Sequence, residues 1–193
     1  MSLRAIACAA ALGWLLLGGA QSGAAASLAL GDAGKQAALS YGRASVDREA
    51  FDAEWRVKNA AGDSVNVITP FHRLAITARH STFRNEPVRP GEPEKLIREL
   101  KDRIVFQLEL HGRQDDFART LVPELLVGER TVKVAFVQND RAPLRLEDGR
   151  FLARCVYAFP VKELTGTSRM TLVVRDREER EVSRFAIDLS QMR

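Results

Sequence analysis

Short stretches in which apolar and polar residues alternate recur along the chain, and they constrain the fold more than any other feature of the sequence. In "RIVFQLEL", every second residue from Ile104 to Leu110 is apolar. In a strand such residues share one face, because successive side chains point to opposite sides. Six other stretches have strand character: "FDAEWRVK", "SVNVIT", "TVKVAFVQ", "RFLARCVYAF", "MTLVVR" and "SRFAIDL". Short strands in this number, separated by turn residues, predict a mainly β chain that forms an antiparallel β-sandwich.

The first two of these strands form a predicted hairpin. Apolar and charged residues alternate from Phe51 to Lys58, and the turn-forming "NAAGD" follows before extended character resumes. The segment "RVKNAAGDSVNV" resembles hairpins of exported bacterial immunoglobulin-like or fibronectin-like modules. This resemblance concerns the turn chemistry of residues 56–67 alone. It implies an immunoglobulin-like or fibronectin-like sandwich and transfers no functional residue.

Two segments interrupt the strand pattern and predict one or two short helices. Thr69 is placed to cap a helix that begins at Pro70, and apolar residues then follow at helical spacing as far as residue 83. The stretch "LAITA" also alternates, so a strand is the alternative there. Three prolines in residues 84–93 indicate a loop, and we expect a short helix from Glu94 to Lys101 after it.

The start of the chain has the order of a secretory signal. A single positive charge at Arg4 precedes an apolar run from Ala5 to Leu17, and a small-x-small site follows at Ala24 and Ala26. The run is shorter than the 20 or so residues that span a bilayer, so we expect cleavage after Ala26, with an uncleaved signal anchor as the alternative. We therefore predict a periplasmic or secreted protein with no membrane span after signal cleavage.

These patterns give three parts: a signal peptide at 1–26, a flexible lead-in rich in Ala, Gly and Ser at 27–48, and a single β-sandwich domain at 49–193. Arg4 is the one charged residue among the first 26, so its removal changes the formal net charge from +4 to +3. The arginines are dispersed along the chain, whereas nucleic-acid binding requires a concentrated basic stripe. Nucleic acid is excluded as a partner on this ground.

The candidate chemistry rests on three histidines. His72 and His80 are eight residues apart, which separates them by about 12 Å along a helix or about 26 Å along a strand. One metal ion holds its ligand atoms about 2 Å away, so it does not bridge this gap. His111 precedes Asp115 and Asp116 in "HGRQDD". A weak metal site is one interpretation, and a solvated turn is the favoured one.

The remaining polar features predict no catalytic, cofactor-binding or metal residue. Glu178 and Glu179 are adjacent, so on a strand they face opposite sides and form no acid–base couple. No serine lies in a G-x-S-x-G elbow. The charged stretch "RDREEREVSR" is interpreted as an exposed hairpin turn rather than as a binding handle.

The alternation also predicts which side chains are buried. Trp55 is interpreted as a core residue, with a surface carbohydrate-stacking residue as the alternative, and Cys155 lies in the middle of an apolar row of "FLARCVYAFP". We expect Cys155 to be a buried, unreactive thiol. The expected core consists of Trp55, Val57, Ile104, Phe106, Leu108, Val132, Val134, Phe136, Phe151, Tyr157, Leu172, Val174, Phe185 and Ile187.

From these observations we expect a monomeric, non-enzymatic interaction or accessory module of the cell envelope that uses a sheet face, an edge or the 84–93 loop to bind a protein partner. A small-ligand or glycan carrier is the first alternative. A hydrolase centred on one of the histidines is the second.

Overall fold

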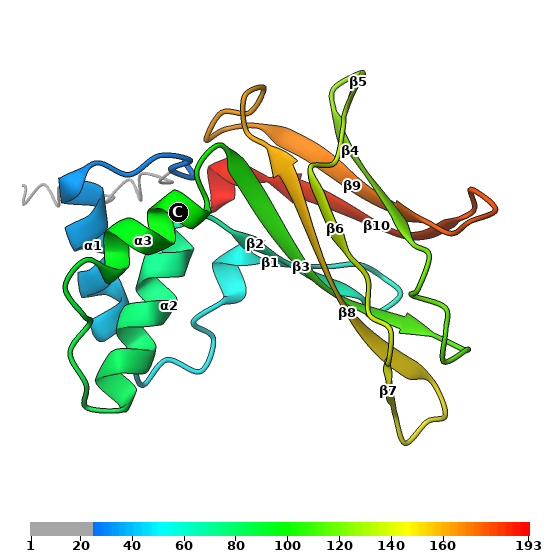
Figure 1. The fold of residues 1–193 in the computed structure, drawn as a ribbon, viewed down its shortest axis with the longest axis horizontal. Helices are drawn as coiled ribbons and strands as arrows, with labels where there is room; N and C mark the ends of the chain where they lie inside the picture. Colours follow the sequence, from blue (N-terminus) through cyan, green and yellow to red (C-terminus); the bar gives the residue numbers. More distant parts are fainter. Residues whose placement is uncertain (1–24) are drawn as a thin grey trace, which may run out of the picture.

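A computed structural model describes residues 25–193 as two antiparallel sheets flanked at one end by three helices (Figure 1). The first sheet has six strands in the order β1-β2-β3-β8-β6, with β7 also paired to β8. Its strands are β1 (Arg56–Lys58), β2 (Ser64–Ile68), β3 (Arg103–Gly112), β6 (Phe136–Gln138), β7 (Leu144–Arg145) and β8 (Phe151–Pro160). Three consecutive strands, β1 to β3, thus lie side by side.

The second sheet has four strands in the order β10-β9-β4-β5. They are β4 (Val122–Val127), β5 (Arg130–Val132), β9 (Arg169–Arg175) and β10 (Glu181–Asp188). The prediction of a mainly β chain with antiparallel sheets and short helices is confirmed at this level. The immunoglobulin sandwich orders its strands ABED and CFG, and this order differs because β1, β2 and β3 are neighbours.

The helices are α1 (Asp32–Arg43), α2 (Pro70–Phe83) and α3 (Glu92–Glu99), with single 3-10 turns at Ala53–Trp55 and Leu189–Gln191. The predicted α2 is confirmed, because the Thr69 side chain accepts a hydrogen bond from the backbone N–H of His72 and Pro70 begins the helix. α3 lies two residues earlier than expected at both ends. α1 falls in the predicted flexible lead-in, and the composition of that segment did not indicate it.

The helices α1 and α2 pack closely enough to require a glycine. A Cβ atom on Gly42 would lie 2.1 Å from the backbone oxygen of Ala75, so any larger side chain would force the two helices apart. Around this crossing a small apolar cluster separate from the sheet core contains Ala38, Leu39, Leu74, Ala78 and Leu96.

The stretch "FDAEWRVK" was wrongly predicted to be one strand. The residues Ala53–Trp55 form a 3-10 turn, and only Arg56–Lys58 pair with β2. Phe51 and Trp55 are both buried, but they pack against the helices and do not lie on a strand face. The ring centroids of Trp55 and His72 are 4.5 Å apart. The predicted hairpin itself is confirmed by the antiparallel register of β1 and β2.

The stretch "TVKVAFVQ" was also wrongly predicted to be one strand. Val132 ends β5 in the second sheet, whereas Phe136 begins β6 in the first sheet. The chain crosses between the sheets at residues 133–135, and alternation does not carry through such a crossing. Phe136 was therefore wrongly placed in the core, since it is 46 % exposed.

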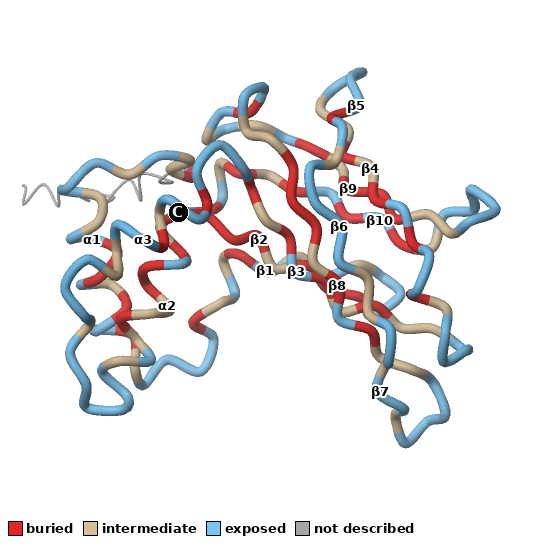
Figure 2. The backbone as a smooth tube through the Cα atoms, viewed as in Figure 1, coloured by how far each residue is buried: buried red, intermediate tan, exposed pale blue. Residues whose placement is uncertain are grey.

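Most of the other expected core positions are confirmed, and both sheets contribute to one apolar cluster (Figure 2). Val57, Val134 and Phe151 are only partly buried. The strand β4, which contains Pro123, was not predicted. The buried members of the expected set are Trp55, Ile104, Phe106, Leu108, Val132, Tyr157, Leu172, Val174, Phe185 and Ile187.

The predicted signal peptide lies outside the described residues except for Ala25 and Ala26. Within residues 25–193, no helix has both the length and the apolar character needed to cross a membrane.

Candidate functional site

His72 lies in the first turn of α2 and is almost fully buried, with 2 % of its surface exposed. Its Nε2 is 3.1 Å from a carboxylate oxygen of Asp52. That hydrogen bond holds the pKa of Asp52 below its usual range, against the opposing effect of partial burial. With its ring also packed against Trp55, His72 joins the helices to the start of the sheet.

His111 belongs to a second polar cluster that sequence reasoning missed. Its backbone N–H donates to Asp63 at 2.9 Å, and its Nδ1 is 3.0 Å from the same oxygen. The other Asp63 oxygen accepts from the hydroxyl of Ser183 at 2.8 Å, and Asn59 donates to Ser183 at 2.8 Å. Ser183 follows Asp63 by 120 residues, so no local motif marks the cluster.

The order of these groups matters for the hydrolase hypothesis. Serine activation needs a histidine between the serine and the carboxylate, to take the hydroxyl proton. Here the Ser183 hydroxyl donates directly to Asp63, while His111 lies on the other carboxylate oxygen. These hydrogen bonds connect the β1–β2 turn to β3 and β10, so the cluster stabilises the fold.

Both acidic pairs that were considered in the sequence lie in turns. Asp115 and Asp116 lie in the exposed turn after β3, and within residues 25–193 no group of three His, Cys, Asp or Glu side chains is placed to hold a metal ion. Glu178 and Glu179 lie in the tight turn between β9 and β10. In this turn the Asp176 carboxylate accepts hydrogen bonds from the backbone N–H groups of Glu178 and Arg180. The prediction that "RDREEREVSR" forms an exposed hairpin turn is confirmed.

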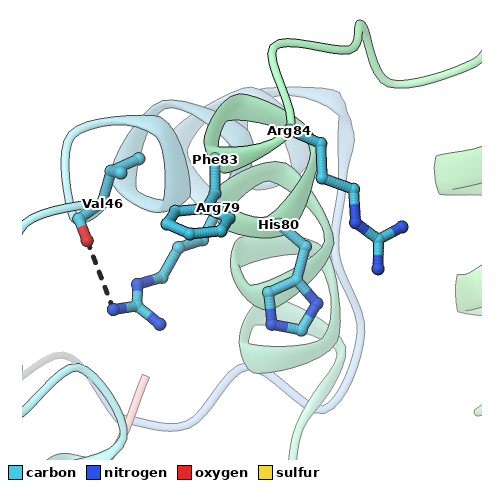
Figure 3. Close-up of a pocket in the computed structure, with 5 residues that line it drawn as sticks. All are labelled: Val46, Arg79, His80, Phe83 and Arg84. Carbon is cyan, nitrogen blue, oxygen red and sulfur yellow. Dashed lines mark hydrogen bonds between the residues drawn. The ribbon is translucent and has the colours of Figure 1, made fainter.

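His80 lines a hollow of about 360 Å³ beside α2 (Figure 3). Arg79 on its wall is already engaged, since it donates to three backbone oxygens, those of Ser45, Val46 and Arg48. In Figure 3 the side chains of Arg79 and Arg84 extend in opposite directions from the helix. The cations of this hollow therefore do not converge on one ligand position.

Cys155 is buried, as predicted. The residue is 1 % exposed, and on β8 it pairs with Leu108 of the neighbouring strand β3. Burial raises the pKa of the thiol, although nearby hydrogen-bond donors act in the opposite direction. A buried thiol with a raised pKa is a poor nucleophile, so Cys155 is not a candidate catalytic group.

The edges of the two sheets differ in the charged side chains that they expose. The edge strand β1 presents Arg56 and Lys58, and β10 presents Glu181 and Arg184, which pair with each other. The edge strand β5 presents Arg130, which pairs with Glu163 at 3.0 Å. Charged side chains on an edge oppose the addition of another strand, so these three edges are protected.

The fourth edge, formed by β6 and β7, is different. The residues of β6 are Phe136, Val137 and Gln138, all exposed and none charged. Five large apolar side chains are strongly exposed in the described part of the chain, and three of them lie here: Phe136 at 46 %, Val137 at 41 % and Leu144 of β7 at 57 %. Figure 2 shows this exposed edge beside the buried β8. We call residues 136–138 and 144–145 the open edge.

Register places apolar groups on both faces of the open edge. Phe136 pairs with Ala158, and Val137 pairs with Tyr157, whose side chain lies in the core. Because neighbouring residues of a strand face opposite sides, Phe136 lies on the outer face and Val137 on the core side. An added strand would thus meet an apolar side chain on each face.

A hollow of about 800 Å³ adjoins the open edge, and it is larger than the hollow beside α2. Three of its lining residues are arginines: Arg119, Arg141 and Arg154. The open edge is held in place by Asn139, whose side chain donates to the backbone oxygen of Leu121 at 2.9 Å. The strand β6 has no charged residue, and Arg145 of β7 is the one charged residue of the open edge. Among the described residues, this combination of an apolar edge strand and a basic hollow is the best candidate for binding.

No protein-family model matches the chain, and no curated protein matches it. A solved structure from Burkholderia pseudomallei, described as a novel protein of unknown function, aligns with 81 % of this chain and 88 % of its own, at 8 % sequence identity and a TM-score of 0.43. At this level the likeness carries no argument about function.

Proposed function

We propose that the protein is an exported, non-enzymatic interaction module of the cell envelope, built on a β-sandwich, that binds an extended segment of a partner protein along the open edge. The observation that carries the proposal is the contrast among the edge strands: β1, β5 and β10 bear charged side chains, whereas β6 bears none and exposes Phe136 and Val137 beside Leu144 of β7. Strand addition gives affinity through backbone hydrogen bonds and specificity through side-chain contacts.

The short length of β6 sets a condition on this binding mode. Three residues offer few backbone hydrogen bonds, so contacts with the neighbouring hollow must supply much of the affinity. The hollow lies beside the same strand, since Phe136, Val137 and Gln138 also line it. Edge and hollow therefore act as one surface.

A ligand carrier is less well supported. Such a protein needs a cavity between its sheets, but in the described part of the chain several large, fully buried side chains fill that space. Phe106 and Phe159 contact each other there with ring centroids 5.8 Å apart, and Tyr157 and Phe185 are also fully buried.

Affinity capture from an envelope extract tests the proposal when two matched variants are compared. Val137→Lys puts a charge on the open edge, and Gln138→Lys does the same at a fully polar position if the first variant is unstable. Phe83→Lys is the control, because Phe83 is 79 % exposed on α2, at the other end of the molecule (Figure 1).

We expect the wild type and Phe83→Lys to retain the same partner, and the edge variants to lose it, with circular dichroism confirming that all fold. Equal capture by the edge variants would contradict the proposal.

A further inference from the structure

We propose that the partner segment is acidic and belongs to a different protein, so that the open edge does not serve to pair two copies of this chain. This inference rests on the proposed function and specifies the chemistry of the same surface.

The arginines beside the open edge form few ion pairs. Within residues 25–193, neither Arg119 nor Arg141 forms an ion pair, and Arg154 makes only a long contact of 3.8 Å with Glu109. The one acid that lines the hollow, Asp140, is occupied by main-chain donors: its two oxygens accept from the N–H groups of Ala142 and Arg154 at 3.0 and 2.8 Å. The hollow therefore has an excess of positive charge available to a partner.

The positive charge beside the open edge disfavours the pairing of two copies of this chain. Two copies joined edge to edge would bring their arginine groups together, and like charges facing one another across an interface oppose association. A partner with Asp or Glu side chains instead gains charge-assisted hydrogen bonds to guanidinium groups. The arrangement thus favours an acidic partner over self-association.

The open edge and its hollow also favour a particular sequence pattern in the partner segment. In an extended segment, alternate side chains face opposite sides. Apolar residues on the core side of the added segment would contact Val137, and acidic residues between them would lie on the outer face, which Phe136 shares with Arg154 of β8. A strand that alternates apolar and acidic residues fits both features of the surface.

Two synthetic eight-residue peptides test the inference by fluorescence anisotropy, one alternating Val and Glu and the other alternating Val and Lys. We expect only the Val–Glu peptide to bind the full mature protein. Its affinity should fall as salt rises to about 0.15 M and above, since salt screens exposed charges. A Val137→Glu variant tests whether the same peptide uses the open edge, and we expect it to weaken binding because it replaces an apolar contact with a charge of the same sign as the peptide.

The arginines are tested with a double variant, Arg119→Ala/Arg141→Ala. We expect it to weaken binding of the Val–Glu peptide by about tenfold or more, the change expected from about 1.4 kcal/mol of lost interaction. The control is Arg73→Ala/Arg177→Ala, which removes the same charge from exposed positions on α2 and the β9–β10 turn. It should leave binding unchanged.

Equal binding of both peptides, a preference for the Val–Lys peptide, or an equal loss in the control variant would overturn the inference. So would a concentration-dependent dimer that Val137→Lys dissolves. Capture of an envelope partner through the edge, together with no preference for acid, would leave the proposed function in place while this inference fails.

Discussion

The hydroxyl of Tyr157 donates a hydrogen bond to the side-chain oxygen of Asn139 at 2.9 Å, and so joins the core of the first sheet to the loop that separates β6 from β7. Asn139 in turn donates to Leu121 in front of β4. A fully buried side chain thus fixes the position of the open edge relative to both sheets.

Replacing Tyr157 by Phe removes this bond while keeping the ring. Because the Asn139 oxygen loses its donor, we expect the free energy of unfolding to fall by about 1 to 2 kcal/mol, measured by urea denaturation. Backbone amides of residues 136–139 should exchange hydrogen faster. The control is Tyr41→Phe, which removes a partly exposed hydroxyl bonded to Glu54; exchange at the edge should not respond to it.

The Asp63 cluster is predicted to stabilise the fold. Asp63→Ala leaves the Ser183 hydroxyl and the His111 backbone N–H without their acceptor, so we expect a loss of about 3 kcal/mol in unfolding free energy. Asp115→Ala, in an exposed turn, should change stability by less than about 0.5 kcal/mol. Equal effects in the two variants would contradict the structural role assigned to Asp63.

Two phenylalanines test the assignment of inside and outside. Phe106 is fully buried and Phe136 is half exposed. Phe106→Ala should therefore cost about 3 to 5 kcal/mol, as large core cavities do, and Phe136→Ala about 1 kcal/mol or less. The comparison is made in one urea series, and a similar cost at both sites would mean that Phe136 packs in the core.

Cys155 is predicted to react slowly in the native protein. The thiolate is the reactive form, and burial both shields the sulfur and raises its pKa above the ordinary value of about 8.5. A thiol reagent should label the folded protein slowly and the denatured protein fast, with a monomer on non-reducing gels. Rapid labelling without denaturant would show that Cys155 is accessible.

The same shift has a consequence for stability. The pKa of Cys155 is higher in the folded protein than in the unfolded chain. Its contribution to the free energy of unfolding is therefore complete below about pH 8.5 and is lost as the pH rises toward the folded pKa. Cys155→Ala should make the decline of stability above that pH less steep.

Ala26 is predicted to remain in the mature protein. It is buried, and its backbone N–H donates to the oxygens of Gly166 and Leu189, both at 3.0 Å. Cleavage after Ala26, as the sequence first suggested, would remove this contact, whereas Ser22 and Ala24 offer a second small-x-small site. Intact-mass measurement of the exported protein should therefore give a chain that starts at Ala25. A start at Ser27 would contradict this expectation, and a start at Met1 would contradict processing.

Local sequence patterns predicted the helices and strands that depend on residues close together in the chain. Alternation identified β3, β8, β9 and β10, and Thr69 with Pro70 identified the start of α2, because side-chain periodicity and capping depend on residues a few positions apart. Burial of Cys155 followed from the same alternation.

The rest depended on contacts between distant segments. Nothing near Phe136 shows that the chain changes sheets after Val132, and nothing near Asp63 points to Ser183. Whether β6 is an edge depends on the order of all the strands. From the sequence, an edge was therefore only one of three possible binding surfaces, beside a sheet face and the 84–93 loop, and no particular residue of the candidate site was predicted.

Site-specific photo-crosslinking in intact cells shows directly whether the open edge binds a partner. A photoreactive amino acid is placed at Gln138 on the open edge, and in a second strain at Phe83 on α2. We predict a crosslinked partner from position 138 alone, attached through a segment rich in Asp or Glu. Crosslinks from position 83 alone, crosslinks to a second copy of this chain, or none at position 138 would contradict the account.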